Sequence, residues 1–458
     1  MSGGNEAIRE MPGVNVDILE ANQRGRRGWH KFVVGKHIKI SPATLQAYCL
    51  AKWEPVAFDL LLLAAAVEIA DRIQRRPSLG WGRDIRVRLP VHQVRRWKDR
   101  VITTRLVSVL ELLTGDRWTI EFVGRQKVVS APPQASLNMP RATSVVLPFS
   151  DGLDSRMAAA LTAAKLGKEL VRVRLGKKFG DWRGNSRDKL PFTAVPYQIK
   201  GFGKRLVETT ARSRGFKFAI VSGLAAYLFK GSRVIVPESG QGALGPVLVP
   251  TGQAYEDYRN HPRFTAEVES FLFALLGHRI NFEFPRLWYT KGETLKVFLN
   301  TPGGAVDWAT TRSCWQQSRQ VSVGGKRRQC GFCAACMLRR LSVHAAGLDE
   351  PADTYVCENL KSSSVELGLA SGYSKFGKTQ REYALAGTLH LDHLASLRSS
   401  PQHLRAVRRN ARQLSKSLGI DSEEVAAKLD RLLMQHELEW KNFLSYLGPK
   451  SFVAKWTE

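Results

Sequence analysis

The chain has 458 residues, of which 43% are hydrophobic and 24% are charged, and its formal net charge is +28. This length allows two or three domains, each with its own buried core, and the composition excludes disordered and fibrous proteins. The longest apolar run, near residues 58–70, contains Asp59 and Glu68 and is too short to span a bilayer, and residues 1–20 lack the pattern of a signal peptide. We therefore expect a soluble, cytoplasmic protein without a membrane partner.

The first 140 residues combine helix and strand patterns but contain no chemical motif. A helical stretch at 41–76 is followed by strand-like runs at 84–91 and 118–123. This order favours an α+β N-terminal domain at 1–140, to which the sequence assigns no role. The segment 130–140 is rich in proline and serine, which is typical of a linker.

From residue 144 onward, short apolar runs alternate with helical patterns. Such alternation predicts an α/β domain with a doubly wound parallel sheet. We expect strands at 145–149, 170–175 and 233–237, helices at 155–166 and 204–212, and a further apolar segment at 216–229.

The chain beyond residue 350 has the periodicity of helices. The stretch 400–418 is strongly basic, and the stretch 422–446 is amphipathic. We expect a helical C-terminal region at 350–458 that acts as a cap or as a partner surface.

Positive charge is concentrated in the middle of the chain, where residues 151–350 hold 31 lysines and arginines against 16 acidic residues. Polyanion binding would explain this excess, because neutralised phosphates release counterions. A nucleotide pocket, an acidic partner or an ordinary basic surface would explain it as well. Nucleic acid is therefore a candidate partner that the charge permits but does not require.

The loop at 150–155 has the composition of a phosphate-binding turn. It joins a predicted strand to a predicted helix, whose first N–H groups and dipole attract an anion. Gly152 can take a positive φ and lets a phosphate approach the backbone. Ser150 and Ser155 add hydroxyl donors, and Asp154 can cap the helix or hold Mg²⁺. A capped helix start without a ligand would use the same residue types, so both interpretations stay open.

The six residues Ser150-Asp151-Gly152-Leu153-Asp154-Ser155 resemble the SGGxDS loop of the PP-loop ATP pyrophosphatases. The resemblance implies that the loop binds ATP with Mg²⁺ and that ATP is cleaved between its α and β phosphates, with Asp154 and Ser155 as catalytic residues. Asp151 stands where the family has its first glycine. Its carboxylate would repel pyrophosphate unless Mg²⁺ or a nearby cation offset the charge.

Four of the six cysteines gather between residues 314 and 336. An upstream cysteine followed by CxxCxxC can surround one ion, and four thiolates without an open position are typical of structural zinc. An iron–sulfur cluster competes with zinc, although the closing CxxxCP of ferredoxins is absent, and free thiols are a third interpretation. The basic run 326–328 would partly offset the charge of a zinc–thiolate unit. The expected ligands are Cys314, Cys330, Cys333 and Cys336, whereas Cys49 and Cys357 are interpreted as core residues.

The order of these motifs carries a more specific resemblance. Thr290-Lys291-Gly292-Glu293, then Ser313-Cys314, then the CGxCxxC run followed by Leu338-Arg339 resemble the C-terminal signature of the 7-cyano-7-deazaguanine synthases. The likeness covers residues 144–347, and on it the chain is identified as a member of this family. Its greater length is similar to that of a branch associated with bacterial anti-phage defence.

The resemblance implies an ATP-dependent ligase that adenylates the carboxylate of 7-carboxy-7-deazaguanine and forms an amide with an amine. The amine belongs to ammonia or, in the defence branch, to a partner protein. The resemblance implies that Lys291 is catalytic; the alternative is that Lys291 and Glu293 form an ion pair on the surface of a helix. It also implies that the zinc ion lies beside the pocket for the base.

The segment Glu238-Ser239-Gly240 follows a predicted parallel strand, at the edge where α/β sheets bind ligands. Glu238 could accept hydrogen bonds from a guanine-like base, or it could be a helix-capping acid. Two other functions stay open for the whole chain. One is a tRNA-modifying PP-loop enzyme such as a thiolase, and the other is a nucleotide-binding scaffold whose catalysis has decayed.

Overall fold

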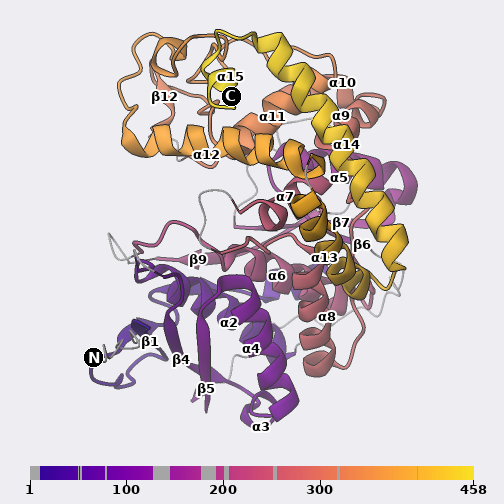
Figure 1. Ribbon diagram of the computed structural model, residues 1–458. Helices are drawn as coiled ribbons and strands as arrows, with labels where there is room; N and C mark the ends of the chain where they lie inside the picture. The colour runs from indigo at the N-terminus through magenta and orange to yellow at the C-terminus, as the bar shows by residue number, and fades with distance from the viewer. Residues whose placement is uncertain are drawn as a thin grey trace, which may run out of the picture.

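The computed structural model describes residues 11–49, 51, 54–77, 80–126, 145–176, 192–200, 206–250, 255–316, 320–399 and 401–457. This part of the chain contains a four-stranded and a five-stranded sheet, both parallel, and a group of C-terminal helices (Figure 1). The α/β class and the parallel sheet next to residues 150–155, called the phosphate-type loop from here on, are therefore confirmed. The predicted linker at 130–140 lies outside the described residues.

The N-terminal sheet has the strand order β2-β1-β4-β5, and all its strand pairs are parallel. The predicted α+β arrangement is not what the structure shows here, because the sheet is wholly parallel and helices connect β2 with β4 and β4 with β5, as in an α/β fold. The helix α2 is buried on nearly all sides, as expected for a helix that packs on a parallel sheet. The elements are β1 (Gly13–Leu19), β2 (His30–Val33), β3 (Ile38–Ile40), α1 (Ala43–Tyr48), α2 (Pro55–Arg72), β4 (Asp84–Val91), α3 (Val94–Trp97), α4 (Arg100–Thr114) and β5 (Arg117–Gly124).

The second sheet has the strand order β11-β10-β6-β7-β8, so the chain runs from the central β6 to one side and later returns to the other. In such a sheet the crevice between the two diverging strands, here β6 and β10, is the usual place for a ligand. The elements are β6 (Val145–Pro148), α5 (Leu153–Leu166), η1 (Gly167–Glu169), β7 (Leu170–Leu175), β8 (Phe192–Val195), β9 (Tyr197–Ile199), α6 (Arg214–Leu228), β10 (Arg233–Ile235), α7 (Gly240–Leu248), α8 (Pro262–Leu276) and β11 (Asn281–Glu283).

The helix predicted at 204–212 is wrong in its described part, because residues 206–211 are not helical and α6 begins only at Arg214. The N–H groups of Val207 and Glu208 both donate to the carbonyl of Arg72, at 2.9 and 3.1 Å, which ties this segment to the end of α2. Ala211 has a positive φ of 46°, which a continuing helix does not allow. Tertiary contacts therefore override the helical pattern.

The two sheets share one hydrophobic core. Apolar residues from α2 and α4, such as Leu62 and Val109, belong to the same buried cluster as Leu224 of α6 and Phe271 of α8. In addition, β3 pairs in antiparallel fashion with β9, which joins the two parts of the chain edge to edge. The N-terminal part is thus packed directly on the part that carries the phosphate-type loop.

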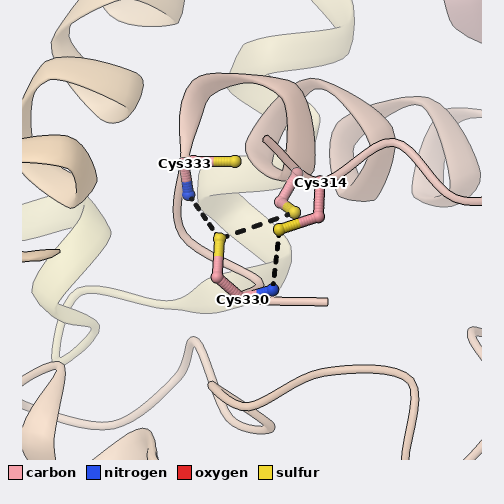
Figure 2. Close-up of side chains that lie close together, drawn as sticks. Cys314, Cys330 and Cys333 are labelled. Atoms are coloured by element: carbon pink, nitrogen blue, oxygen red, sulfur yellow. Dashed lines mark hydrogen bonds between the residues drawn. The ribbon is translucent and has the colours of Figure 1, made fainter. Parts of the chain in front are cut away.

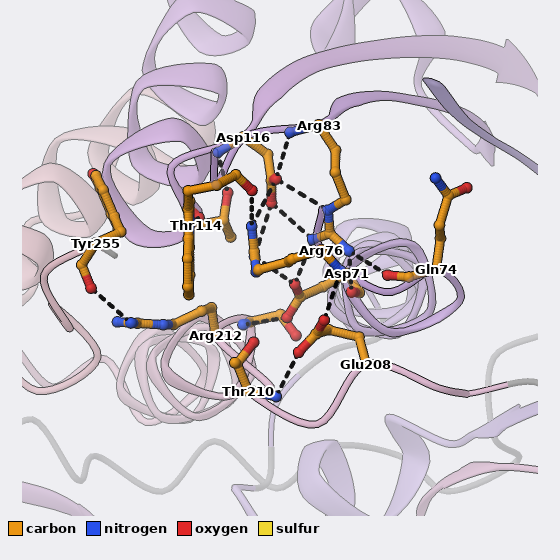
Figure 3. Close-up of polar contacts among 12 residues, drawn as sticks. Asp71, Gln74, Arg76, Arg83, Thr114, Asp116, Glu208, Thr210, Arg212 and Tyr255 are labelled. Carbon is orange, nitrogen blue, oxygen red and sulfur yellow. Dashed lines mark hydrogen bonds and ion pairs between the residues drawn. The ribbon is translucent and has the colours of Figure 1, made fainter. Parts of the chain in front are cut away.

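A buried group of charged side chains lies at the same junction (Figure 3). Arg83 is fully buried, and its Nη2 atom lies 2.9 Å from Asp71 Oδ1 and 2.8 Å from Asp116 Oδ2. Arg76 contacts the same two aspartates. The second oxygen of Asp71 accepts a hydrogen bond from the N–H of Ser213, just before α6, at 2.9 Å. Removing any one of these side chains would leave a buried charge without its partner. The contacts therefore fix how the N-terminal part meets the segment before α6.

The C-terminal region is helical from Lys378 onward, as predicted, but residues 350–377 form turns around one short 3₁₀ helix. None of the helices in the described ranges combines the length and the apolar composition that a membrane span requires. The remaining elements are α9 (Lys291–Leu299), α10 (Gly304–Asp307), η2 (Trp308–Thr310), β12 (Ser322–Val323), β13 (Lys326–Arg327), α11 (Ala334–Ala345), η4 (Glu366–Gly368), α12 (Lys378–Ala395), η5 (Ser396–Arg398), α13 (Pro401–Leu418), α14 (Ser422–Leu447) and α15 (Phe452–Lys455).

Candidate active site and metal centre

The loop 150–155 lies at the carboxyl end of β6 and leads into α5. The hydroxyl oxygens of Ser150 and Ser155 are 2.9 Å apart, and Gly152 N donates to Ser150 Oγ at 3.2 Å. Among the described residues no side chain caps the start of α5, and the first amides of such a helix are available to an anion. Gly152 has φ −74° and does not use the left-handed conformation expected of it. The Leu153 side chain is buried in the core.

Asp151, the departure from the family loop, has a cationic partner. Arg174, near the end of β7, donates to both carboxylate oxygens, from Nη1 to Oδ1 at 2.9 Å and from Nη2 to Oδ2 at 2.6 Å. A bidentate pair of this kind is among the stronger charge-assisted contacts in proteins. The negative charge that Asp151 adds to the loop is therefore offset by a residue of the neighbouring strand.

Lys291 connects the phosphate-type loop with the second motif. Its Nζ atom lies 2.5 Å from Asp154 Oδ2, and its side chain is only 4% exposed. Thr290 and Glu293 form a capping box at the start of α9, which fixes the direction in which Lys291 leaves the helix. The alternative ion pair with Glu293 is not formed, since Glu293 pairs with Arg431. The other oxygen of Asp154, Oδ1, is buried without a hydrogen-bond partner among the described residues.

A cavity of about 470 Å³ opens beside Asp154, between α5, α9 and the ends of β10 and β11. This volume lies within the usual range of small-molecule sites. Glu238 and Ser239 line it together with Asp154, and the buried Ser239 Oγ has no hydrogen-bond partner in the described ranges. Most of the wall is apolar, with cationic side chains also contributing: Met157, Ala158, Leu161, Leu166, Ile235, Val236, Pro237, Phe284, Pro285, Val297, Lys165, Arg233 and Arg286.

Glu238 has an unusual environment. Burial, and then the charge of Asp154, raise the pKa of its carboxyl group to about 8. Asn260 Nδ2 donates to Glu238 Oε2 at 3.0 Å. The N-cap of α7 is Ser239 rather than Glu238. Gly240 does not line the cavity; a Cβ there would lie 2.2 Å from the carbonyl oxygen of Leu287, so the position requires glycine for packing.

The four clustered cysteines form a potential metal site (Figure 2). The sulfur atoms of Cys314, Cys330, Cys333 and Cys336 all lie within 4.8 Å of one another. Backbone N–H groups of Gln316 and Cys330 donate to Cys314 Sγ at 3.4 and 3.2 Å, as expected for a sulfur that carries negative charge. The group can therefore bind a metal ion such as zinc. Cys49 and Cys357 are buried in the core, as predicted.

The metal site and the phosphate-type loop are joined by the segment 311–314. Arg312, two residues before Cys314, donates from its backbone N to the carbonyl oxygen of Asp151 at 2.9 Å. The buried Arg339 holds the same segment, because its Nη1 atom donates to Thr311 Oγ1 at 2.6 Å. A metal ion at the cysteines would thus stiffen the backbone that supports the loop. Of the basic run 326–328, Arg328 pairs with Asp353 and Glu358 instead of facing the sulfurs.

Three contributors to this arrangement were missed by sequence reasoning: Arg174, Arg312 and Gln241, whose side-chain oxygen accepts from Lys291 N at 2.7 Å. Arg174 has one recognisable signal, since it is a cation at the carboxyl end of a predicted strand.

Comparison of the chain with models of protein families, with curated proteins and with solved structures gave no match. A functional assignment therefore depends on the residues and geometry described above.

Proposed function

We propose that this chain is an ATP-dependent carboxylate–amine ligase of the 7-cyano-7-deazaguanine synthase type, with a PP-loop for ATP and a structural zinc ion at the four cysteines. Its acid substrate is 7-carboxy-7-deazaguanine or a close analogue. One observation carries the proposal. The Lys291–Asp154 contact joins two motifs that are 137 residues apart in the sequence, beside a cavity that α5, α9, β10 and the end of β11 line.

The reaction has two steps. An oxygen of the substrate carboxylate attacks the α-phosphorus of ATP, the bond to the bridging oxygen breaks, and pyrophosphate leaves. The amine then attacks the acyl carbon, loses a proton and expels AMP, which leaves an amide. Adenylation is needed because a free carboxylate is negatively charged and has no good leaving group.

The residues of the site suit the first step. The amides of 150–155 and the Lys291 ammonium would stabilise the charge that develops on the departing pyrophosphate. The free oxygen of Asp154 could hold Mg²⁺, which screens the phosphates when bound. Glu238 and Ser239 would orient the base in the cavity, whose apolar wall suits a flat heterocycle.

The acceptor amine distinguishes two forms of the reaction. With ammonia the product is a small-molecule amide, which a second activation could convert to a nitrile. With an amine of a partner protein, as implied for the defence branch, the product is a protein that carries the deazaguanine. Incubation with ATP, Mg²⁺ and the acid should yield AMP and pyrophosphate; formation of ADP instead would refute the proposal. Mass spectrometry of co-expressed neighbouring proteins would detect a deazaguanine adduct.

Replacing Arg174 by methionine is expected to weaken MgATP binding about tenfold, because Asp151 would then repel the phosphates without compensation. Calorimetric titration with a non-hydrolysable ATP analogue measures this effect. The double variant Arg174→Met/Asp151→Gly is the matched control, since it removes both charges and should bind like the unaltered protein. Equal weakening in the single and double variants would show that the pair does not act through charge.

Binding of the guanine-like acid is expected to strengthen as the pH rises, by about tenfold per pH unit below 8, and then to level off. The reason is that only the ionised Glu238 carboxylate accepts hydrogen bonds from both base donors. Burial raises this pKa, so the folded protein holds the Glu238 proton more tightly than the unfolded chain does. The contribution of Glu238 to folding stability therefore falls as the pH rises from about 4.5 to about 8. Titrations of Glu238→Gln should lose the pH dependence. Glu283→Gln, which alters another cavity acid, should keep it.

A tRNA-modifying enzyme is the second candidate, and α13 favours it. This helix contains no acidic residue and exposes a row of cations, for which no ion pair is formed within the described residues: Arg405, Arg408, Arg409, Arg412 and Lys416. Tight, salt-sensitive tRNA binding that is lost on reversal of these charges would support this candidate. Nucleotide binding without any turnover would instead support a decayed scaffold.

A further inference from the structure

The C-terminal helix α14 reaches the candidate active site with its buried face. His436 is fully buried, Glu439 is nearly so, and both lie on the side of α14 that meets α7 and the start of α9. Thr290 Oγ1 donates to Glu439 Oε1 at 2.6 Å, and Arg431 pairs with Glu293. Each end of the capping box around Lys291 is therefore held by a residue of α14.

A chain of hydrogen bonds leads from His436 to Lys291. Gln241, in α7, contacts both residues: its Oε1 atom accepts from Lys291 N at 2.7 Å, and its Nε2 atom lies 2.7 Å from His436 Nδ1. On its other side, His436 Nε2 lies 2.8 Å from the carbonyl oxygen of Leu391. A carbonyl only accepts, so Nε2 carries the proton and Nδ1 accepts from Gln241. Burial lowers the pKa of His436 to about 4, which agrees with this neutral form.

Only one arrangement of these hydrogen bonds satisfies every donor and acceptor between His436 and Lys291. Lys291 N–H requires the amide oxygen of Gln241, so the amide nitrogen must face His436, and His436 must present a lone pair there. Gln241 and Lys291 are 2% and 3% exposed, so water does not compete for these contacts. An apolar residue at 436 would pack but would leave the buried Gln241 nitrogen without a hydrogen-bond partner, which is unfavourable.

We propose that His436 is a positioning residue: acting through Gln241, it fixes the backbone at Lys291 and so keeps the lysine ammonium directed at Asp154. The C-terminal helix is then part of the active site and more than an outer cap. The catalytic consequence rests on the proposed function, whereas the positioning itself does not, so the two are tested separately.

Two substitutions separate the two hydrogen bonds of His436. In His436→Asn the side-chain amide lies near the position of Nδ1 and can still accept from Gln241. In His436→Gln the longer side chain can still donate to Leu391 but offers no acceptor in the right place. Trp440→Phe is the matched control on the same helix, because it removes a hydrogen bond to Asp392 of α12 and part of a buried ring but leaves Gln241 untouched. Gln241→Met, which leaves α14 unaltered, serves if a histidine variant does not fold.

The first readout is the rate at which acetic anhydride modifies Lys291, measured by peptide mass spectrometry without nucleotide. We expect modification about tenfold faster in His436→Gln and Gln241→Met, because the lysine loses its fixed position, and an unchanged rate in His436→Asn and Trp440→Phe. Equal rates in His436→Gln and His436→Asn, or a faster rate in Trp440→Phe, would overturn the proposal.

The second readout is the rate of AMP formation with unchanged KM for MgATP, which should fall in the same order of variants. A fall in Trp440→Phe equal to that in His436→Gln would show that α14 only stabilises the fold. If the unaltered protein itself forms no AMP, the proposed function fails, while the modification rates still decide whether His436 positions Lys291.

Discussion

Replacing Lys291 by methionine is expected to lower the rate of AMP formation by about 10²–10³-fold. Methionine keeps the length and packing of the buried side chain but removes the ammonium group, which lies 2.5 Å from Asp154. The Asp154 carboxylate would then face the phosphates with less compensation. Because the lost interaction strengthens as charge develops on pyrophosphate, the decrease should appear in kcat more than in KM.

Lys296→Met is the control for this substitution, since Lys296 is an exposed lysine of the same helix, α9. It should retain the full rate. Single-turnover measurement of AMP and pyrophosphate separates the chemical step from product release. A rate for Lys291→Met within a factor of about three of the unaltered protein would exclude a role in the transition state, as that factor corresponds to less than about 1 kcal/mol.

Replacing Cys336 by alanine is expected to abolish stoichiometric metal binding and to lower the melting temperature by more than about 10 °C. Cys336 is fully buried, and three remaining thiolates would hold zinc far more weakly than four. The backbone of 311–314 would lose its anchor, so the phosphate-type loop should also bind nucleotide less tightly. Elemental analysis of the purified protein and a thermal scan measure the two effects.

Cys357→Ala provides the matched control, because Cys357 is equally buried in the same hydrophobic cluster but lies outside the group of four sulfurs. It should keep about one zinc ion per chain and lose only the small stability of one packed thiol. Iron with visible absorbance in the unaltered protein would replace the zinc assignment with an iron–sulfur cluster. Absence of any metal would support the third interpretation, in which the four cysteines are free thiols.

The features that sequence predicted well depend on short-range patterns. The CxxCxxC spacing determines which sulfurs can reach one ion, and the structure brings Cys314 to them. The strand at Val145–Pro148 and the helix that follows were predictable because a short apolar run ends in a turn rich in serine, aspartate and glycine. Lys291 was predicted from a motif, and its contact with Asp154 gives that motif a physical meaning.

The features that sequence could not predict depend on contacts between distant segments. Parallel pairing of the N-terminal strands is a property of the whole sheet, so the order of strand and helix patterns alone does not distinguish α/β from α+β. The helical pattern at 204–212 is overridden by hydrogen bonds that this segment forms with the end of α2. Gln241 and His436 meet across 195 residues, and neither has a local pattern that would distinguish it from an ordinary polar residue.

The core shared by the two sheets has a consequence for any attempt to divide the protein. A fragment that begins at Val145 would expose the sides of α6 and α8 that α2 and α4 now cover, and would leave Ser213 without Asp71. Such a fragment should aggregate when expressed alone, although it contains every motif of the candidate site. We therefore expect the part of the chain that carries the candidate site to need the N-terminal part for its stability, and the two sheets to unfold together.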